Sequence, residues 1–277
     1  MVMKKNPKST PRAAKKASLP PPGNKVKAPS DGGRMTLAEA MSALEQLGNE
    51  QTRKTWERHG ARGPLFGVKL GDLARLVKRI GVDQELANEL WDTGNEDART
   101  LAVKVADPAR VGEADLGRWA REASWRLHLA YVAQLASETP HAAKKASQWL
   151  KKTDEQEGLA GWTLVGQLAL RDATTPDRWF QDRLAEIEKR IGAAPNFQRE
   201  AMGQALIAIG GRSAALRAAA FAASKRIGKI EVDHGDTACK TPDAIPYIEK
   251  MWAHARAKGF ETPAAQERTR EAPRCRC

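Results

Sequence analysis

The chain has 277 residues, of which 41% are hydrophobic, and a formal net charge of +12. The hydrophobic share is enough for a substantial core, while no apolar run approaches the roughly 18 residues that a membrane span needs. We therefore expect no membrane partner. No apolar stretch follows the basic first residues, which excludes a secretory signal. Three cysteines without a framework spacing favour reduced thiols in a cytosol-like compartment.

Residues 1–33 are predicted to be a disordered basic tail. They hold eight Lys and Arg residues against Asp31 alone, a balance of +7, and they contain few large apolar side chains. The run from Pro20 to Gly23 excludes a helix there. Such a tail favours polyanions through counterion release, although a purely solubilising extension is the alternative.

Residues 34–261 carry a nearly balanced charge of about +3 and read as helical almost throughout. Thr36, Asp83 and Asn95 are placed to cap three helices in the first part of this region. Gly81 is placed to end the predicted helix that precedes Asp83. No alternating pattern of useful length predicts a strand, so the fold class is expected to be all-α.

Four X-Pro pairs, at residues 108, 140, 176 and 195, each precede a predicted helix, and we expect these prolines in the first helical turns. The first three recur about every 35 residues, which fits two short helices and their turns. This period is typical of helical-hairpin arrays, so we expect an α-α superhelix of irregular HEAT-like repeats. A compact, non-repetitive helical bundle is the alternative.

Two helices, 197–209 and 214–227, come before a polar loop at 231–243, and a last helix is expected at 245–258. Residues 262–277 hold four Arg against two Glu and are expected to form a second disordered tail. Its final cysteines, Cys275 and Cys277, are interpreted as part of a frayed terminus.

The loop at 231–243 is dense in functional groups, namely Asp233, His234, Asp236 and Cys239. Their spacing matches no zinc pattern, and aspartates mixed with one Cys and one His suit no single metal well. We therefore predict no metal site and no cofactor. A Cys239–His234 nucleophilic pair lacks an orienting third group in the sequence, so side chains that hold the loop together are the favoured interpretation.

Trp125 and Arg126 stand next to each other in the middle of the chain. A tryptophan beside arginine can stack on a nucleobase, but tryptophan is more often a core residue. If basic residues of several helices share the inner wall of a solenoid, they form a track for a phosphate backbone. The residues predicted to lie on that track are Lys69, Arg99, Arg199 and Lys240.

Several segments resemble the AlkD-like DNA alkylation repair family. The resemblance covers about residues 36–258 and is carried by segments 66–73, 85–91, 96–99, 196–203 and 232–244. It implies a HEAT-like solenoid whose concave face holds duplex DNA, in a bacterial cytosolic, nucleoid-associated protein that we expect to be monomeric. Active members hydrolyse the glycosidic bond of N3- or N7-alkylated purines without flipping the lesion into a pocket. Their catalytic aspartate, four residues after a tryptophan, stabilises the cationic sugar.

This sequence departs from that pattern at the catalytic position. If Trp125 is the matching tryptophan, Leu129 stands where the aspartate is expected, and Arg126 stands at a position that is acidic in many relatives. Glu122 lies one helical turn before Arg126 and is the candidate replacement carboxylate. The family's DNA-contacting arginine has no clear match either, because the corresponding helix reads Gly-Trp-Thr-Leu-Val at 161–165.

Three hypotheses follow. The chain is an N-glycosylase of alkylated purines with a displaced carboxylate, a non-catalytic DNA-binding module, or a scaffold for proteins that docks through the loop at 231–243. The resemblance favours the first two over the third.

Overall fold

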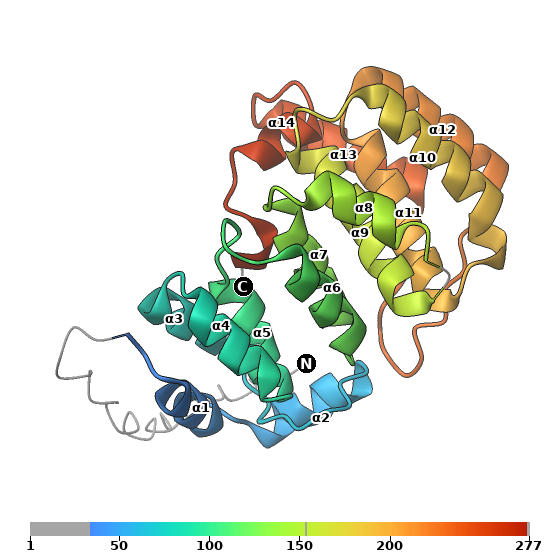
Figure 1. Cartoon of the computed structure of the whole chain (residues 1–277). Coiled ribbons are helices and arrows are strands. Elements are labelled where there is room, and N and C mark those ends of the chain that lie inside the picture. The colour runs from blue at the N-terminus through green and yellow to red at the C-terminus, as the bar shows by residue number, and fades with distance from the viewer. Residues whose placement is uncertain (1–33, 153, 276–277) are drawn as a thin grey trace, which may run out of the picture. The chain divides into compact units, whose positions relative to one another are not determined.

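The computed structural model describes residues 34–152 and 154–275 (Figure 1). All regular structure in this part of the chain is helical, with fourteen α-helices and two short 3-10 helices, so the all-α prediction is confirmed. None of the described helices has the length and apolar content to cross a bilayer. The predicted basic tail, residues 1–33, lies outside the described residues.

In chain order the helices are α1 Leu37–Gln46, α2 Glu50–Arg58, α3 Leu70–Ile80, α4 Gln84–Asp92, α5 Glu96–Val105, α6 Glu113–Glu122, α7 Arg126–Ser137, α8 Ala142–Trp149, α9 Glu155–Arg171, α10 Asp177–Arg190, η1 Ile191–Ala193, α11 Asn196–Gly210, α12 Ala214–Ile227, α13 Ala244–Ala257, α14 Pro263–Arg268 and η2 Pro273–Cys275.

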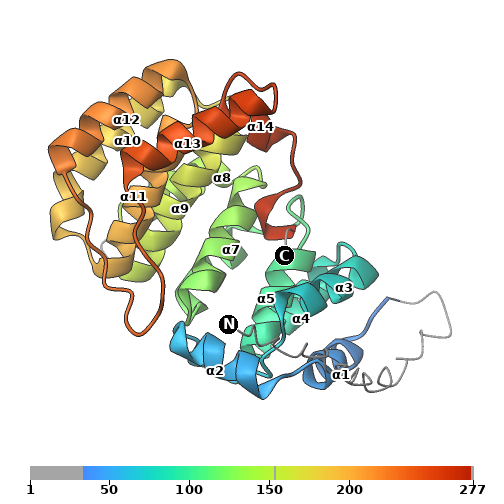
Figure 2. The same cartoon turned by 180° about the vertical axis from the view of Figure 1, so that it is seen from behind.

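From α4 to α11 the helices are arranged as antiparallel pairs that follow one another in sequence order. The second members of the pairs, α5, α7, α9 and α11, pack side by side as an inner row, which Figures 1 and 2 show from opposite sides. The helices α4, α6, α8 and α10 cover the outside of this row. This is the expected HEAT-like arrangement, and it excludes the compact, non-repetitive bundle.

The predicted helix boundaries rest on capping side chains that the structure contains. Thr36 and Glu39 form a full capping box at α1, the Asp83 carboxylate accepts the backbone N–H of Leu86, and Asn95 caps α5. The prediction that the prolines lie in first helical turns is wrong. Pro176 is the N-cap residue of α10, and the other three also lie before their helices, because an X-Pro pair favours extended backbone at the turn.

Tryptophan and small residues fill the space between the pairs. Trp91 and Trp119 stack with their ring centroids 4.6 Å apart and their planes within 8°, which joins the α4–α5 pair to the α6–α7 pair. Trp149, Trp162 and Phe180 are also fully buried. Buried Gly and Ala residues also lie along the inner row, and Gly166 of α9 allows close approach of Ala205 and Ala208 of α11.

The prediction of a disordered tail at 262–277 is wrong for residues 262–275, while residues 276–277 lie outside the described part. Thr262 caps α14, with Pro263 in its first turn, and α14 packs against α9. Arg274 is only 4% exposed and donates to both carboxylate oxygens of Glu138 and to two main-chain carbonyls of α5. An arginine-rich composition predicted solvent exposure, but these partners neutralise the guanidinium in the interior.

Candidate nucleic-acid interface

Two adjoining cavities lie on the exposed side of the inner row. The first, of about 510 Å³, is lined mainly by α7, α9 and α11, and the second, of about 470 Å³, extends from it to the end of α2 and the loop after α12. We call the two together the inner groove. Both cavities are lined by His59, Trp125, Arg126, Leu159 and Phe197, so they form a continuous surface.

Trp125 forms the junction between the two cavities. It is the N-cap residue of α7 and is 5% exposed, so its interpretation as a core residue is confirmed. Its Nε1 donates to the carbonyl of His59 at 2.9 Å, and its ring lies 5.5 Å from the ring of Trp56. The indole N–H is therefore satisfied inside the protein, and the ring carbon atoms form the groove surface.

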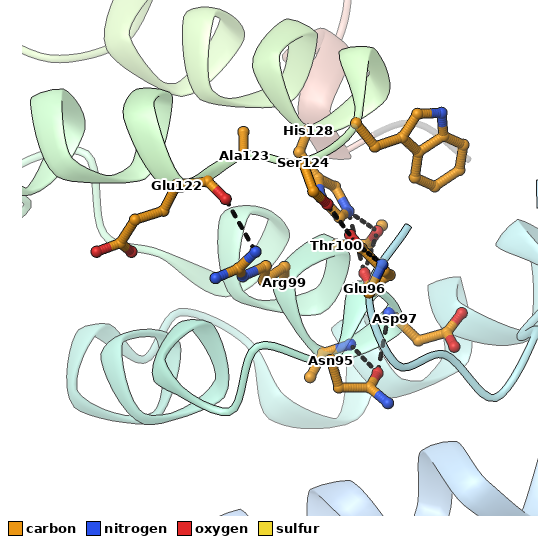
Figure 3. A network of polar contacts seen from close by, with 12 residues as sticks. Asn95, Glu96, Asp97, Arg99, Thr100, Glu122, Ala123, Ser124 and His128 are labelled. Atoms are coloured by element: carbon orange, nitrogen blue, oxygen red, sulfur yellow. Dashed lines mark hydrogen bonds and ion pairs between the residues drawn. The ribbon is translucent and has the colours of Figure 1, made fainter. Parts of the chain in front are cut away.

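A buried polar network fixes the start of α7 (Figure 3). The carboxylate of Glu96, at the first position of α5, accepts from the hydroxyl of Ser124 and lies 3.0 Å from Nδ1 of His128 on α7. Both Glu96 and His128 have fully buried side chains. Burial acts to raise the pKa of Glu96, but hydrogen bonds from His128, Ser124 and Gly63 prevail and lower it to about 2.

The neighbouring carboxylate holds the loop before α3. Asp97 accepts the backbone N–H groups of Phe66, Gly67 and Val68 at 2.7 to 2.9 Å. Burial raises the pKa of Asp97 even though these three hydrogen bonds lower it. The segments at 66–73 and 96–99, which carry part of the family resemblance, are thus the two halves of one contact. Their shared function is to position the elements that line the groove.

Arg126 projects from the first turn of α7 into the groove. Its Nη1 lies 3.0 Å from the carboxylate of Glu200 on α11, and its guanidinium covers the ring of Phe197 at 4.7 Å. These contacts join α7 to α11 across α9. The structure therefore places two of the predicted DNA-binding residues, Trp125 and Arg126, together in the inner groove.

Two arginines that the sequence analysis missed also line the groove. Arg58 ends α2, and Arg62 follows it in the next loop; both are exposed. Neither has a carboxylate partner among the described residues, and Arg62 donates only to the carbonyl of Glu57. The sequence did not distinguish these arginines from other surface arginines, because it does not show that the end of α2 lies beside the start of α7.

The other predicted contacts do not gather with these. Arg99 donates to the carbonyls of Trp91 and Glu122, and Arg199 donates to those of Ile191, Ala194 and Glu231. Both guanidiniums therefore close turns of the main chain. Lys69 is exposed and lines none of the described cavities. Lys240 is exposed and lines, with Arg199, a third cavity of about 1080 Å³, which shares Asn196, Asp233 and His234 with the second.

The candidate carboxylate Glu122 lies outside the groove. It accepts from Nε1 of Trp91 at 2.7 Å and from Arg118, so it ties α6 to α4 (its main-chain carbonyl and Arg99 are labelled in Figure 3). Leu129, which occupies the family's catalytic position, lines the second cavity and is 4% exposed. Within the groove, the nearest carboxylate to Arg126 is that of Glu200.

The polar loop at 231–243 borders the second cavity through Asp233 and His234. Asn196 holds it with a pair of hydrogen bonds to the main chain of Asp233, at 2.7 and 2.8 Å, and His234 contacts the hydroxyl of Thr241 at 3.0 Å. Asp236 and Cys239 are exposed. Over the described ranges, no group of three or more His, Cys, Asp or Glu side chains is arranged to hold a metal ion.

Comparisons with known proteins agree with this geometry. A family model described as "DNA alkylation repair enzyme" matches residues 40–248. Uncharacterized proteins of Listeria innocua and Listeria monocytogenes are each 28% identical over 78% of this chain and 97% of their own length. A solved structure matches with a TM-score of 0.74 and 31% identity, over 82% of this chain and 97% of its own. It is described as one of "a new family of proteins related to the HEAT-like repeat DNA glycosylases with affinity for branched DNA structures".

Proposed function

Because the chain belongs to the DNA alkylation repair enzyme family, we propose that it acts in repair as a DNA-binding protein that holds branched DNA in its inner groove. The observation that carries this proposal is the combination, on one surface, of an aromatic floor with two arginines that have no carboxylate partner in the described part of the chain. The description of the similar solved structure supports the same class of ligand.

The two kinds of side chain suit two parts of a nucleic acid. Arg58 and Arg62 complement phosphates, and each phosphate contact releases condensed counterions. Trp56 and Phe197, which are half-buried, offer ring surface that suits unstacked bases, and Trp125 supports them from the core. A continuous duplex hides its base faces within the stack, whereas a branch point exposes them. A groove with both kinds of surface therefore favours branched DNA over a plain duplex.

The proposal is tested with the double variant Arg58→Ala/Arg62→Ala. Removal of two cations that face phosphates should weaken binding to a three-way junction and flatten the dependence of log K on log salt concentration by about 2 units. The matched control is Arg75→Ala/Arg178→Ala, which removes the same charge from exposed positions that line none of the described cavities. Equal salt dependence in both variants, measured by fluorescence anisotropy, would reject the groove as the binding surface.

Glycosidic hydrolysis of alkylated purines is the second candidate function, and Glu200 is the observation that favours it. Its carboxylate lies in the groove beside Arg126, at a place where it can stabilise developing positive charge. Glu122 fits this role less well, because it lies outside the two cavities of the inner groove, whereas Glu200 lines the first of them.

The second candidate predicts release of 7-methylguanine or 3-methyladenine from methylated DNA, with loss of release on Glu200→Gln and no loss on Glu122→Gln. Binding alone predicts no release at a high excess of protein. Chromatography of the bases released by the wild-type protein separates the two functions.

A further inference from the structure

We infer that the first cavity of the inner groove is a receptor for a single unpaired nucleobase at a DNA branch point. This inference rests on the proposed binding of branched DNA and names the part of that DNA which enters the cavity. The volume, about 510 Å³, lies within the range of roughly 300–1,000 Å³ typical of small-molecule pockets.

The aromatic side chains present ring surface to the cavity. Nε1 of Trp56 donates to the carbonyl of Val68 at 3.2 Å, and Nε1 of Trp125 donates to that of His59 at 2.9 Å. Both polar edges are therefore bonded to main chain, and the remaining indole surface is apolar. Phe197 completes the floor, with Arg126 over its ring. Stacking against such rings tolerates every base, because every base has a π-face.

The cavity also contains polar side chains whose hydrogen-bonding groups are not used by the part of the chain that the structure describes. Gln167 on α9 and Gln204 on α11 line it, and neither side chain forms a hydrogen bond with another described residue. Carboxamides pair in bidentate fashion with base edges. Trp162, which is fully buried, lines the same cavity.

The arginines proposed to contact phosphates lie next to the first cavity. Arg58 and Arg62 border the second cavity, which shares Trp125 and Phe197 with the first. A nucleotide whose base enters the first cavity can thus leave its backbone beside cationic side chains. A paired base offers neither a free face nor a free Watson–Crick edge. The cavity's combination of rings and amides therefore fits an unpaired base.

The test uses the full chain and three-way junctions with one unpaired nucleotide at the branch point. Replacing that nucleotide with an abasic residue should weaken binding by the wild-type protein about tenfold, which corresponds to one base–aromatic stack. In Gln167→Ala/Gln204→Ala and in Phe197→Leu, the difference between base and abasic junctions should shrink. The matched control is Gln46→Ala/Gln181→Ala, at exposed positions outside the groove, which should keep the tenfold difference.

A spectroscopic measurement shows directly where the base lies. 2-Aminopurine at the unpaired position should lose fluorescence when the protein binds, whereas the same probe in a paired arm should not. Equal affinity for base and abasic junctions, with unchanged 2-aminopurine fluorescence, would overturn the inference and leave branched-DNA binding intact. Failure to bind any junction at low salt would instead overturn the proposed function itself.

Discussion

Glu96 and Asp97 are adjacent carboxylates whose pKa values are shifted in opposite directions by the balance of burial and hydrogen bonding. Burial penalises both charges. Side-chain donors to Glu96 outweigh that penalty and lower its pKa to about 2, whereas three main-chain donors to Asp97 do not, and its pKa is raised. The two residues therefore make opposite contributions to the dependence of stability on pH.

The buried Glu96 carboxylate gives the first prediction. Its pKa in the folded protein lies below the ordinary value of 4.5, so the stability it contributes is complete above that pH and is lost as the pH falls towards about 2. Glu96→Gln should lower the free energy of unfolding at neutral pH by about 3 kcal/mol and flatten its fall over that range. Urea unfolding at several pH values measures both effects.

The control for this prediction is Glu45→Gln, at an exposed position of α1, which should retain the wild-type pH dependence. An unchanged acid slope in Glu96→Gln would show that other carboxylates determine acid unfolding.

At the residue scale, the sequence predicted which side chains cap helices better than it predicted the hydrogen-bond partners of buried side chains. Asn95 is a local signal, since its side chain accepts from residues two and three positions later. The donors to Glu96 come from about 30 positions away on both sides, and no local pattern specifies them. The same limit explains why Arg58 was missed and why Glu122 was proposed for chemistry. The position of each relative to the groove depends on helix packing.

At the scale of elements, one arrangement occurs twice. Arg99 on α5 and Arg199 on α11 each donate through Nε to the carbonyl eight residues earlier, at the end of the preceding helical segment. A further nitrogen of each reaches a carbonyl from the next element of the fold. A cation at carbonyls of a helix end complements the helix dipole, so these arginines stabilise the turn within each pair.

The second prediction concerns this turn. Arg199→Ala removes the donors to three carbonyls and should lower the free energy of unfolding by about 2 kcal/mol, equivalent to roughly 6 °C in Tm. At temperatures below the Tm of the variant, affinity for a DNA junction should be unchanged, because the guanidinium of Arg199 donates to main-chain carbonyls and not to DNA. Lys240→Ala serves as the comparison and should alter neither quantity. A loss of DNA affinity without a loss of Tm would restore Arg199 as a DNA contact.

Helix existence was largely predictable from sequence, because Asp83, Asn95 and Gly81 mark helix ends through local chemistry. The helix α14 was missed because its cap, Thr262, stands in a polar, arginine-rich stretch that resembles a tail. Its stability comes from contacts with α9, which lies about 100 positions earlier. Such tertiary stabilisation of a short helix leaves no periodic signal in the sequence.

At the scale of the whole molecule, the segment at 262–275 binds to helices from the first half of the chain. Arg274 contacts Glu138 near the end of α7, and Nζ of Lys104 donates to the carbonyl of Arg274 at 2.7 Å. Burial raises the pKa of Glu138, and Arg274 opposes that rise. The inner row is thereby closed at the end opposite to the groove-lining start of α7.

The third prediction follows from this contact. Arg274→Ala leaves the partly buried Glu138 unpaired and should lower the free energy of unfolding by about 3 kcal/mol. Arg270→Ala, which removes an exposed arginine of the same segment, should have an effect below about 0.5 kcal/mol. Chemical unfolding of both variants gives the comparison. Equal stabilities would mean that the ion pair is dispensable.

The fourth prediction separates general from local attraction to DNA. Residues 1–33 contribute +7 of the net +12, so their deletion should flatten the salt dependence of DNA binding by about 0.9 for each phosphate that the tail neutralises. The preference for a junction over a duplex should persist, because it is attributed to the groove. Loss of that preference on deletion would move specificity from the folded part to the tail.

The loop at 231–243 has a consequence for how the protein can be divided. It joins α12 to α13 without regular structure, and its exposed Lys240 offers a cleavage site. Beyond the loop, the indole of Trp252 donates to Gly210, and α14 is joined to α9 through Arg171 and Glu267. Backbone cleavage at such a loop should leave these contacts intact. The two fragments should then remain associated, and when expressed separately they would make a split protein whose reassembly serves as a reporter.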